Sequence, residues 1–176
     1  MSISTPKITR VAAQATGDTT SIPYISSIID KYISEPSIDP FARNSQLCKV
    51  TNDMNPETNA MFNMEAEAFL QQYEDESFSF AIFDPPYSPR QIKELYDGSG
   101  LKLTQEQTQS KQWSIWGEQV GRILNVNGVC VKLSWNSCRP FKNARLLEMM
   151  CVCHGGMHND TIITVWEKTQ HQHSFF

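Results

Sequence analysis

The chain has 176 residues, of which 40% are hydrophobic and 19% charged, and its formal net charge is −4. This length suits one domain with a hydrophobic core and is short for two. The acidic balance argues against a protein that binds nucleic acid by bulk charge alone, although it allows a local basic face. No apolar run approaches the roughly 20 residues of a membrane helix, and the N-terminus lacks the pattern of a signal peptide. We therefore expect a soluble, intracellular protein.

The N-terminal part of the chain predicts an arm followed by a helix. Residues 1–18 are small and polar without a clear period, which is typical of a flexible arm. Residues 20–33 favour a helix, because isoleucines recur on one face, and Pro36 ends it. We expect the globular domain to cover residues 19–169 and a polar tail to follow at residues 170–176.

The next part of the chain predicts short strands and one helix. Residues 37–42 and 48–54 are each typical of a short strand that runs into polar residues. Residues 63–73 begin as a short strand or turn and continue as a helix. Residues 78–83, with the sequence FSFAIF, favour a strand that is buried on both faces, as a central parallel strand is.

The C-terminal half continues the alternation and ends in a hairpin. Residues 103–125 favour a long helix, since tryptophans and aliphatic residues lie at helical spacing, and residues 128–135 favour a strand. Residues 141–150 predict a helix, or a helix that runs into a strand. Residues 149–154 and 161–168 flank a Gly-containing loop and predict a hairpin. Alternating strands and helices indicate an α/β fold with a parallel sheet and helices on both faces.

An acid, two prolines and an aromatic residue, Asp84, Pro85, Pro86 and Tyr87, follow the strand at 78–83 directly. Ligands of an open parallel sheet bind at the carboxyl ends of its strands, so this acid can face a ligand. The prolines fix the backbone and have no N–H to donate. The turn therefore presents the Asp84 carboxylate and the Pro85 carbonyl, two acceptors that suit an NH2 group, and Tyr87 offers a face for a base. An ordinary Asp-Pro turn is the simpler interpretation.

These four residues resemble the DPPY motif of the amino-methyltransferases, which methylate the exocyclic amino group of adenine or cytosine in DNA. The resemblance implies that Asp84 accepts an amino hydrogen, that Pro85 contributes its carbonyl, that Pro86 shapes the turn and that Tyr87 stacks on a flipped base. It also implies a three-layer, Rossmann-like class I methyltransferase domain. The sheet of that fold has seven mostly parallel strands and ends in an antiparallel hairpin.

The resemblance further implies a site for S-adenosylmethionine made of three segments. The first is similar to the opening of the family's cofactor motif, the second to the end of its second strand, and the third to the segment that flanks the cofactor's adenine. The acid of the second segment commonly binds the ribose hydroxyls in this family. The matching residues are Asp39, Pro40 and Phe41, then Asp53 and Met54, then Glu65 with Ala66.

The loop after Phe41 departs from the family pattern. The family has a Gly-rich turn there, whereas residues 42–45 of this chain are Ala-Arg-Asn-Ser. Either Asn44 makes the turn in a left-handed conformation, or the cofactor is held more loosely. Arg43 can also contact a carboxylate. Asp39 has a simpler interpretation as the cap of a turn or helix.

Basic residues that can contact nucleic acid occur in two places. Arg90 and Lys93 follow the DPPY turn, and Arg139 and Lys142 come later in the chain. A solvated loop explains the first group equally well. Residues 88–112 offer the only room for a target-recognition insertion. We therefore expect low sequence specificity, a separate recognition subunit or a homodimer.

The cysteines are five in number, and an odd number favours reduced thiols, mostly packed in the core. Cys151, Cys153, His154 and His158 are potential zinc ligands. Their spacing is unusual for a structural zinc site, and on a strand the two cysteines face one side while His154 faces the other. We therefore expect no metal site, with the cysteines in the core and the histidines in a loop.

The sequence as a whole predicts an enzyme that uses S-adenosylmethionine to methylate the amino group of adenine in DNA. We expect it in the cytoplasm of a prokaryote or of a virus-infected cell, in a restriction-modification system or a phage, and without a membrane partner. Alternatives stay open: cytosine or RNA as substrate, an inert subunit that binds nucleic acid or a partner, or an enzyme that cleaves the donor without an acceptor. A protein amide is disfavoured, because the related motif for glutamine usually begins with Asn.

Overall fold

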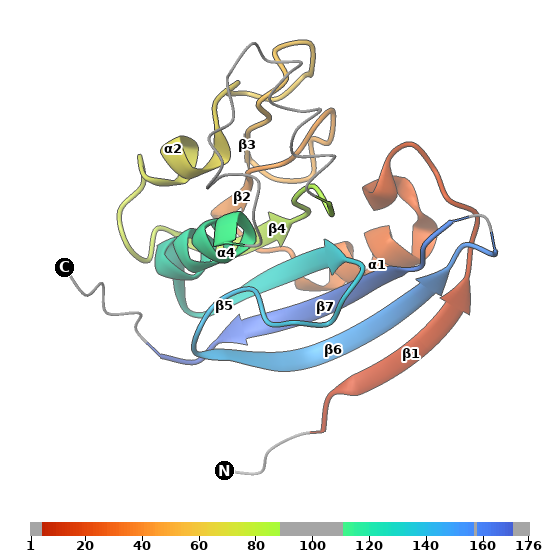
Figure 1. The fold of residues 1–176 in the computed structure, drawn as a ribbon. Helices are drawn as coiled ribbons and strands as arrows, with labels where there is room; N and C mark the ends of the chain where they lie inside the picture. The colour runs from red at the N-terminus through yellow and green to blue at the C-terminus, as the bar shows by residue number, and fades with distance from the viewer. Residues whose placement is uncertain (1–4, 89–110, 157, 171–176) are drawn as a thin grey trace.

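The computed structural model describes residues 5–88, 111–156 and 158–170. Its centre is a seven-stranded sheet with the order β1-β6-β7-β5-β4-β2-β3 (Figure 1). The strands are β1 (Lys7–Ala12), β2 (Ser37–Asp39), β3 (Val50–Thr51), β4 (Phe78–Phe83), β5 (Leu124–Ser134), β6 (Ala144–Cys153) and β7 (Thr161–Lys168). β7 is antiparallel to its neighbours β5 and β6, and the other neighbours are parallel. The predicted seven-stranded, mostly parallel sheet with a final antiparallel hairpin is confirmed.

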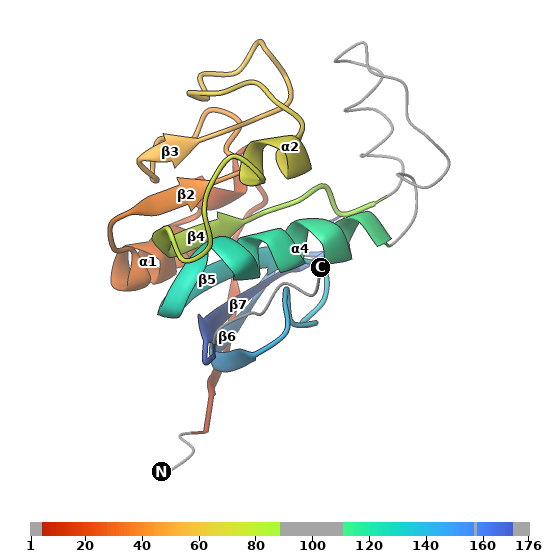
Figure 2. The same cartoon turned by 90° about the vertical axis from the view of Figure 1, so that its left-hand side faces the viewer.

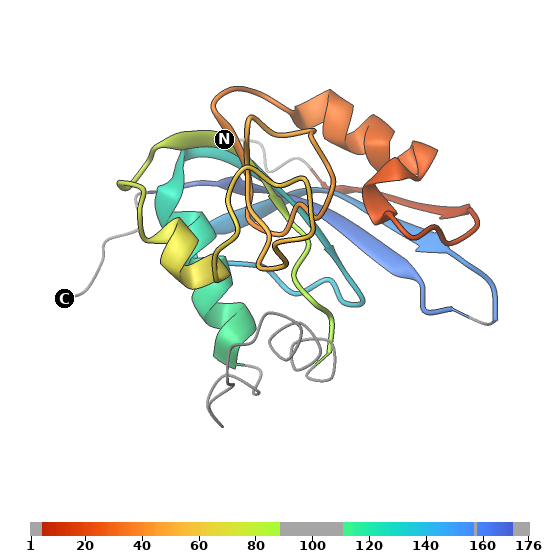
Figure 3. The ribbon, with the colours of Figure 1, turned by 90° about the horizontal axis from the view of Figure 1, so that it is seen from above.

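Helices cover both faces of the sheet. The 3₁₀ turn η1 (Thr19–Ser21) leads into α1 (Pro23–Tyr32) on one face, and α2 (Ala66–Leu70) and α4 (Lys111–Ile123) cover the other. Figure 3 shows α1 on one side of the strands and α2 with α4 on the opposite side. The predicted three-layer α/β class is therefore confirmed. Within the described ranges, no helix is both long enough and apolar enough to cross a membrane.

The central strand β4 explains how the layers are held together. Figure 2 shows it between β2 and β5, and it occupies the residues predicted for it, 78–83. Phe80 and Ile82 pack with α1, whereas Ala81 and Phe83 belong to the cluster on the side of α2 and α4. Double burial of this kind is what a parallel strand between two others requires. It also fixes the point at which the following turn leaves the sheet.

Residues 7–12 form an edge strand, β1, which corrects the flexible arm expected over residues 1–18. β1 pairs in parallel with β6 along its whole length. Val11 packs against the cluster on the α1 side, while Ile8 on the other face is 64% exposed. An edge strand with mixed polar residues gives a weak periodic signal, and its partner lies far along the chain, so local pattern could not identify it.

Residues 144–153 form strand β6, which corrects the helix expected over residues 141–150. Leu, Glu and Met are good helix formers, so the local sequence favoured a helix. Pairing with β1 on one edge and β7 on the other overrides that preference. The end of the long helix is also corrected, since β5 begins at Leu124, directly after Ile123.

The cysteines are free thiols, but fewer of them lie in the core than expected. Cys48 and Cys130 are buried, Cys138 is exposed, and Cys151 and Cys153 are half-buried. The last two lie on β6, where one face of the strand is packed against α1 and the other is more open.

Gly117 on α4 should not tolerate a larger side chain. A Cβ atom at this position would lie 1.9 Å from the Pro140 carbonyl oxygen. Ala in place of Gly normally stabilises a helix interior by about 1 kcal/mol. We expect Gly117→Ala instead to lower the free energy of unfolding by about 1–3 kcal/mol, as overpacking does. Urea denaturation measures the change, with Gly156→Ala as control, because Gly156 has no atom within 4 Å of its added Cβ. Equal stability of the two variants would contradict the close approach.

Candidate active site

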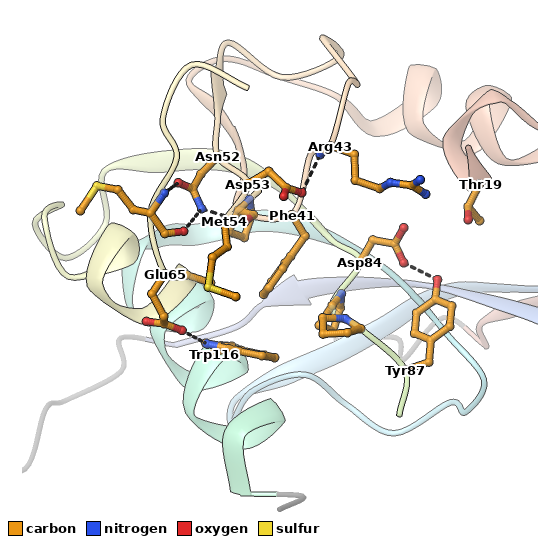
Figure 4. Close-up of a pocket in the computed structure, with 15 residues that line it drawn as sticks. Thr19, Phe41, Arg43, Asn52, Asp53, Met54, Glu65, Asp84, Tyr87 and Trp116 are labelled. Carbon is orange, nitrogen blue, oxygen red and sulfur yellow. Dashed lines mark hydrogen bonds between the residues drawn. The ribbon is translucent and has the colours of Figure 1, made fainter. Parts of the chain in front are cut away.

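A cavity of about 390 Å³ lies where β2, β3 and β4 end and α2 begins (Figure 4). The carboxyl ends of parallel strands meet at one edge of a sheet, so residues far apart in the chain come together here. Every residue predicted for catalysis or cofactor binding lines this cavity except Asp39. The lining residues are Thr19, Pro40, Phe41, Arg43, Asn52, Asp53, Met54, Met64, Glu65, Ala66, Asp84, Pro85, Pro86, Tyr87 and Trp116.

The DPPY turn forms one wall of the cavity directly after β4. The Tyr87 hydroxyl donates a hydrogen bond to the Asp84 carboxylate, and Figure 4 shows the two side chains facing each other. The turn is also held from α4, because the Trp113 indole N–H donates to the Pro86 carbonyl at 2.6 Å. The structure thus brings the four predicted catalytic residues to one wall, and their roles stay predictions.

The Asp84 carboxyl is the titratable group at the centre of this wall. Burial raises the pKa of Asp84 to about 7, although the hydrogen bond from Tyr87 and the charge of Arg43 act in the opposite direction. Near neutral pH the group therefore exists in both protonation states. The Tyr87 hydroxyl bonds the Oδ1 atom of Asp84, and a carboxylate has a second oxygen that can accept a hydrogen bond from an amino group. The Tyr87 ring also lies beside the exposed Trp135 ring, with 5.3 Å between the ring centroids.

Asp39 does not line the cavity, and its predicted role in cofactor binding stays a prediction. It is 2% exposed, and its carboxylate accepts a hydrogen bond from the Phe41 N–H at 3.0 Å. This is the turn cap that the sequence allowed as the simpler interpretation. Burial raises the pKa of Asp39 to about 8, and the neighbouring charges of Asp84 and Asp53 act in the same direction. Asp39 thus shapes the turn that presents Pro40 and Phe41 to the cavity.

An aromatic cluster forms the apolar side of the cavity. The Phe41 ring meets the Trp116 ring edge-on at 5.1 Å between centroids and the Phe83 ring at 5.8 Å. The Trp116 indole N–H donates to Glu65 at 3.0 Å, and the second carboxylate oxygen of Glu65 accepts the Ala68 N–H at 3.0 Å. Glu65 therefore caps α2 and joins it to α4. Its predicted place beside the cofactor's adenine stays a prediction.

Arg43 forms the bend of the loop at residues 42–45, where the sequence has no glycine. Its φ angle is 51°, so Arg43, and not the expected Asn44, takes the left-handed conformation. Such a conformation is uncommon outside glycine. The Arg43 N–H donates to Asp53 at 3.0 Å, and the other carboxylate oxygen of Asp53 accepts the Asn55 N–H at 2.8 Å. Asp53 thus holds two loops at the end of β3 while it lines the cavity.

Arg43 and Asp84 lie at the opposite end of the cavity from Met54 and Trp116. Figure 4 shows the side chains of Arg43, Asp84 and Tyr87 at one end, Met54 and Trp116 at the other, and Phe41 between them. The Arg43 guanidinium donates to the Gly17 carbonyl at 2.7 Å, which fixes it beside the segment that precedes η1. A ligand with one charged end and one flat apolar end would fit this division.

Asn52 is a structural residue of the cavity that the sequence did not single out. It is 0% exposed, and its amide nitrogen donates to the Pro40 and Met64 carbonyls at 3.1 Å each. Its amide oxygen accepts the Met64 N–H at 3.0 Å. These bonds join the turn after β2 to the segment before α2. A polar residue directly after a buried strand was the only signal for this role.

A second cavity, of about 570 Å³, shares Pro85 and Tyr87 with the first. Arg139 and Lys142, two of the predicted nucleic-acid contacts, line it together with Trp113 and the loop that follows β5. The DPPY turn therefore separates a cavity at the ends of β2 and β3 from a cavity with basic residues at its border.

Lys132 on β5 is a buried cation in the lining of the second cavity, and sequence reasoning missed it. It is 7% exposed, and its ammonium group donates to the Asn136 side-chain oxygen at 3.0 Å and to the Cys138 carbonyl at 2.8 Å. Burial lowers the pKa of Lys132. The position of this lysine directly between Val131 and Leu133 was the signal that could have identified it.

Several predicted features lie outside the described residues. They include Arg90 and Lys93, the start of the long helix expected over residues 103–125, and the end of the polar tail at residues 171–176. Their predicted roles stay predictions.

Replacing Asp39 by Asn should change how stability depends on pH. Asn can still accept the Phe41 N–H, but it does not titrate. The pKa of Asp39 is raised from 3.8 to about 8, so its contribution to stability is present below pH of about 4 and is lost as pH rises through about 8. We expect Asp39→Asn to gain stability relative to the wild type across this range in urea denaturation. The exposed Asp30→Asn serves as control, and parallel curves for Asp39→Asn and the wild type would contradict the buried acid.

Comparison with known proteins places the fold but not the family. No family model and no curated protein matches the sequence. A conserved hypothetical protein from Streptococcus pyogenes matches with a TM-score of 0.52 and 14% identity, over 84% of this chain and 99% of that one. TrmN from Thermus thermophilus matches with a TM-score of 0.56 and 13% identity, over 85% of this chain and 49% of TrmN.

A third solved structure is YhhF from Escherichia coli, described as a candidate methyltransferase. It matches with a TM-score of 0.50 and 12% identity, over 83% of this chain and 82% of YhhF. Likeness at these identities shows the fold alone. The chain therefore has the fold of the Rossmann-like class I methyltransferases.

Proposed function

We propose that this chain transfers a methyl group from S-adenosylmethionine to the exocyclic amino group of adenine in DNA. The observation that carries the proposal is the position of the DPPY turn, since Pro85 and Tyr87 line both cavities. A group-transfer enzyme must hold a donor and an acceptor with the reacting atoms between them. The likeness of the fold to methyltransferase structures supports methyl transfer in general.

The first cavity suits S-adenosylmethionine, which supplies a methyl group on a positively charged sulfur. Its volume lies in the range of roughly 300–1,000 Å³ that is usual for small-ligand sites. Phe41, Met54 and Trp116 offer an apolar surface for the adenine ring. Asp53 and Glu65 each place a carboxylate at the border of this surface, where ribose hydroxyls or the base can donate to it.

The Arg43 guanidinium suits the other end of the donor. It lies at the charged end of the cavity, close enough to Asp84 to lower the pKa of that carboxyl. In the proposed complex, Arg43 binds the carboxylate of the donor's methionine part through a charge-assisted hydrogen bond. The Arg43 side chain would thus bind the donor's carboxylate at a place where the DPPY family has a Gly-rich turn.

The second cavity suits a flipped base and the phosphates beside it. Tyr87 and Trp135 offer neighbouring aromatic faces, on which a base can stack. Arg139 and Lys142 bring positive charge to the same cavity, which suits phosphate groups. These contacts do not depend on a strongly basic protein and are compatible with the net charge of −4.

The chemistry assigned to the turn is mainly positioning. The Asp84 carboxylate accepts one amino hydrogen, and the Pro85 carbonyl accepts the second. These two contacts align the nitrogen lone pair with the methyl carbon. Alignment of this kind lowers a reaction barrier by up to about 7–11 kcal/mol in well-oriented cases. As the nitrogen gains the methyl group it loses a proton, which Asp84 can take up.

The decisive test is methyl transfer from labelled S-adenosylmethionine to unmethylated DNA and to RNA. We expect transfer to DNA by the wild type and a loss of turnover of roughly 10²–10³-fold in Asp84→Asn, as for the loss of one positioned hydrogen-bonding group. Calorimetry should show donor binding retained in Asp84→Asn, because in the proposed complex Arg43, Phe41 and Trp116 make the main contacts with the donor.

The exposed Asp30→Asn is the matched control and should keep full activity. Transfer to RNA with none to DNA would replace the proposed substrate. Absence of donor binding, with or without DNA, would favour an inert subunit, and donor breakdown without an acceptor would show a cleavage enzyme.

Activity should also depend on pH through Asp84. In the proposed reaction Asp84 must be ionised to take up the proton that the amino group loses, and its pKa is raised to about 7. We expect kcat/KM to rise with pH and to level off above pH of about 7, with roughly a tenth of the plateau one pH unit below the pKa. Initial rates across this range measure the profile. A flat or falling profile would contradict an ionised Asp84 in the reaction.

A further inference from the structure

We propose that Cys151, Cys153 and Asp160 form a zinc-binding site at the end of the β6–β7 hairpin. The site is separate from the two cavities of the proposed function and does not depend on that function. Each of the three residues offers one ligand atom, and these atoms all lie within 4.8 Å of one another. The sequence pattern led us to expect no metal site here, because it did not single out Asp160 as a ligand beside the two cysteines.

The strand β6 explains why the two thiols meet. Residues two apart on a strand face the same side. Met150 and Val152 pack with the cluster on the α1 side, so Cys151 and Cys153 face the opposite side of the sheet. Their sulfur atoms lie 3.8 Å apart. Asp160 directly precedes β7, and the hairpin brings it back beside the end of β6.

The distances match the edges of a zinc tetrahedron. Zn–S bonds of about 2.3 Å place two sulfur ligands about 3.8 Å apart in a tetrahedral site, and a Zn–O bond of about 2.1 Å places the oxygen about 3.6 Å from a sulfur. The observed separations are 3.8 Å between the two sulfur atoms and 3.5 Å between the Cys151 sulfur and an Asp160 oxygen. The fourth place of the tetrahedron is left for water.

The surroundings orient these ligands and balance their charge. The Arg10 Nε–H donates to the Cys153 sulfur at 2.9 Å, and the His154 N–H donates to the second Asp160 oxygen at 3.4 Å. Bonds of this kind to metal ligands are typical of metal sites. Two thiolates and one carboxylate carry three negative charges, which a divalent ion and Arg10 together neutralise. Binding exchanges the thiol protons for the ion, with no oxidation or reduction.

The His154 ring is engaged elsewhere. Its Nδ1 atom lies 2.9 Å from the Ala13 carbonyl oxygen, and its Nε2 atom lies 2.9 Å from the Thr161 hydroxyl. The ring thus joins the hairpin to the segment after β1, and the sulfur and carboxylate ligands lie beside this contact. His154 and Thr161 also line a cavity of about 380 Å³ that Tyr87 borders. Because Tyr87 also lines the first cavity, a bound ion would fix the connection between β6 and β7 close to the candidate active site.

The test uses the full chain, stripped of metal with a chelator and kept reduced. Zn²⁺ is titrated in competition with a coloured chelator, and Co²⁺ serves as a spectroscopic probe of sulfur ligands. We expect one tightly bound Zn²⁺ and a sulfur-to-cobalt charge-transfer band in the wild type. Both should be lost in Cys151→Ser and Cys153→Ser, and Zn²⁺ affinity should fall in Asp160→Asn. Arg10→Gln should weaken Zn²⁺ binding by roughly 10–100-fold, as changes next to metal ligands do.

The matched control is Cys138→Ser, since Cys138 is exposed and lies outside the cluster. It should bind Zn²⁺ as the wild type does, and Zn²⁺ should raise the thermal midpoint of both. All variants keep the histidines at 171 and 173, so any Zn²⁺ binding by these histidines cannot explain a difference between the variants. Equal Zn²⁺ affinity in Cys151→Ser and Cys138→Ser, or a folded wild type without the charge-transfer band, would overturn the site. If a cysteine variant does not fold, the Zn²⁺ affinity of Asp160→Asn still tests the site, and an affinity equal to that of the wild type would contradict it.

Discussion

The parallel pairing of β2, β3 and β4 is the constraint on which the candidate site depends. Because these strands point the same way, the segments that follow them all leave the sheet at one edge. β4 is anchored by side chains buried on both faces, so the Asp84 turn starts from a rigid position. Asn52 and Asp53 then use side-chain hydrogen bonds to join the loops that β2 and β3 deliver. The parallel strands therefore determine where the cavity lies, and the side-chain hydrogen bonds of Asn52 and Asp53 determine its shape.

The interior charges of the site follow from the same arrangement. Asp39 and Asp84 end adjacent parallel strands, so two carboxyl groups come close together where water is scarce. Both then have raised pKa values, chiefly because burial disfavours their ionised forms. Arg43 is the compensating cation for Asp84. A carboxyl group with a pKa near neutrality is suited to both hydrogen-bond acceptance and proton uptake, which fits its proposed place in methyl transfer.

The parts that could be predicted from the sequence are those whose signal is local. β4 is an apolar run buried on both faces, α1 has a one-sided isoleucine pattern, and the final hairpin surrounds a Gly-containing loop. The parts that could not be predicted depend on distant partners. β1 is a strand only because β6 lies beside it, and β6 overrides the helical preference of its own residues. At the site, the order of the motifs along the chain predicted most of the cavity lining. It did not predict that the Asp39 side chain is buried away from the cavity, or that Lys132 is buried.

The late position of β6 in the chain has a consequence for how the protein is made. β1 is synthesised first, yet its partner strand ends only at Cys153. During translation β1 therefore stays without its partner strand until the residues of β6, up to Cys153, have left the ribosome. Contacts across such long sequence separations are slow to form, and unpaired strand edges favour aggregation while they wait. The mixed polar and charged composition of β1, with Lys7 and Arg10, helps keep this segment dissolved in the meantime.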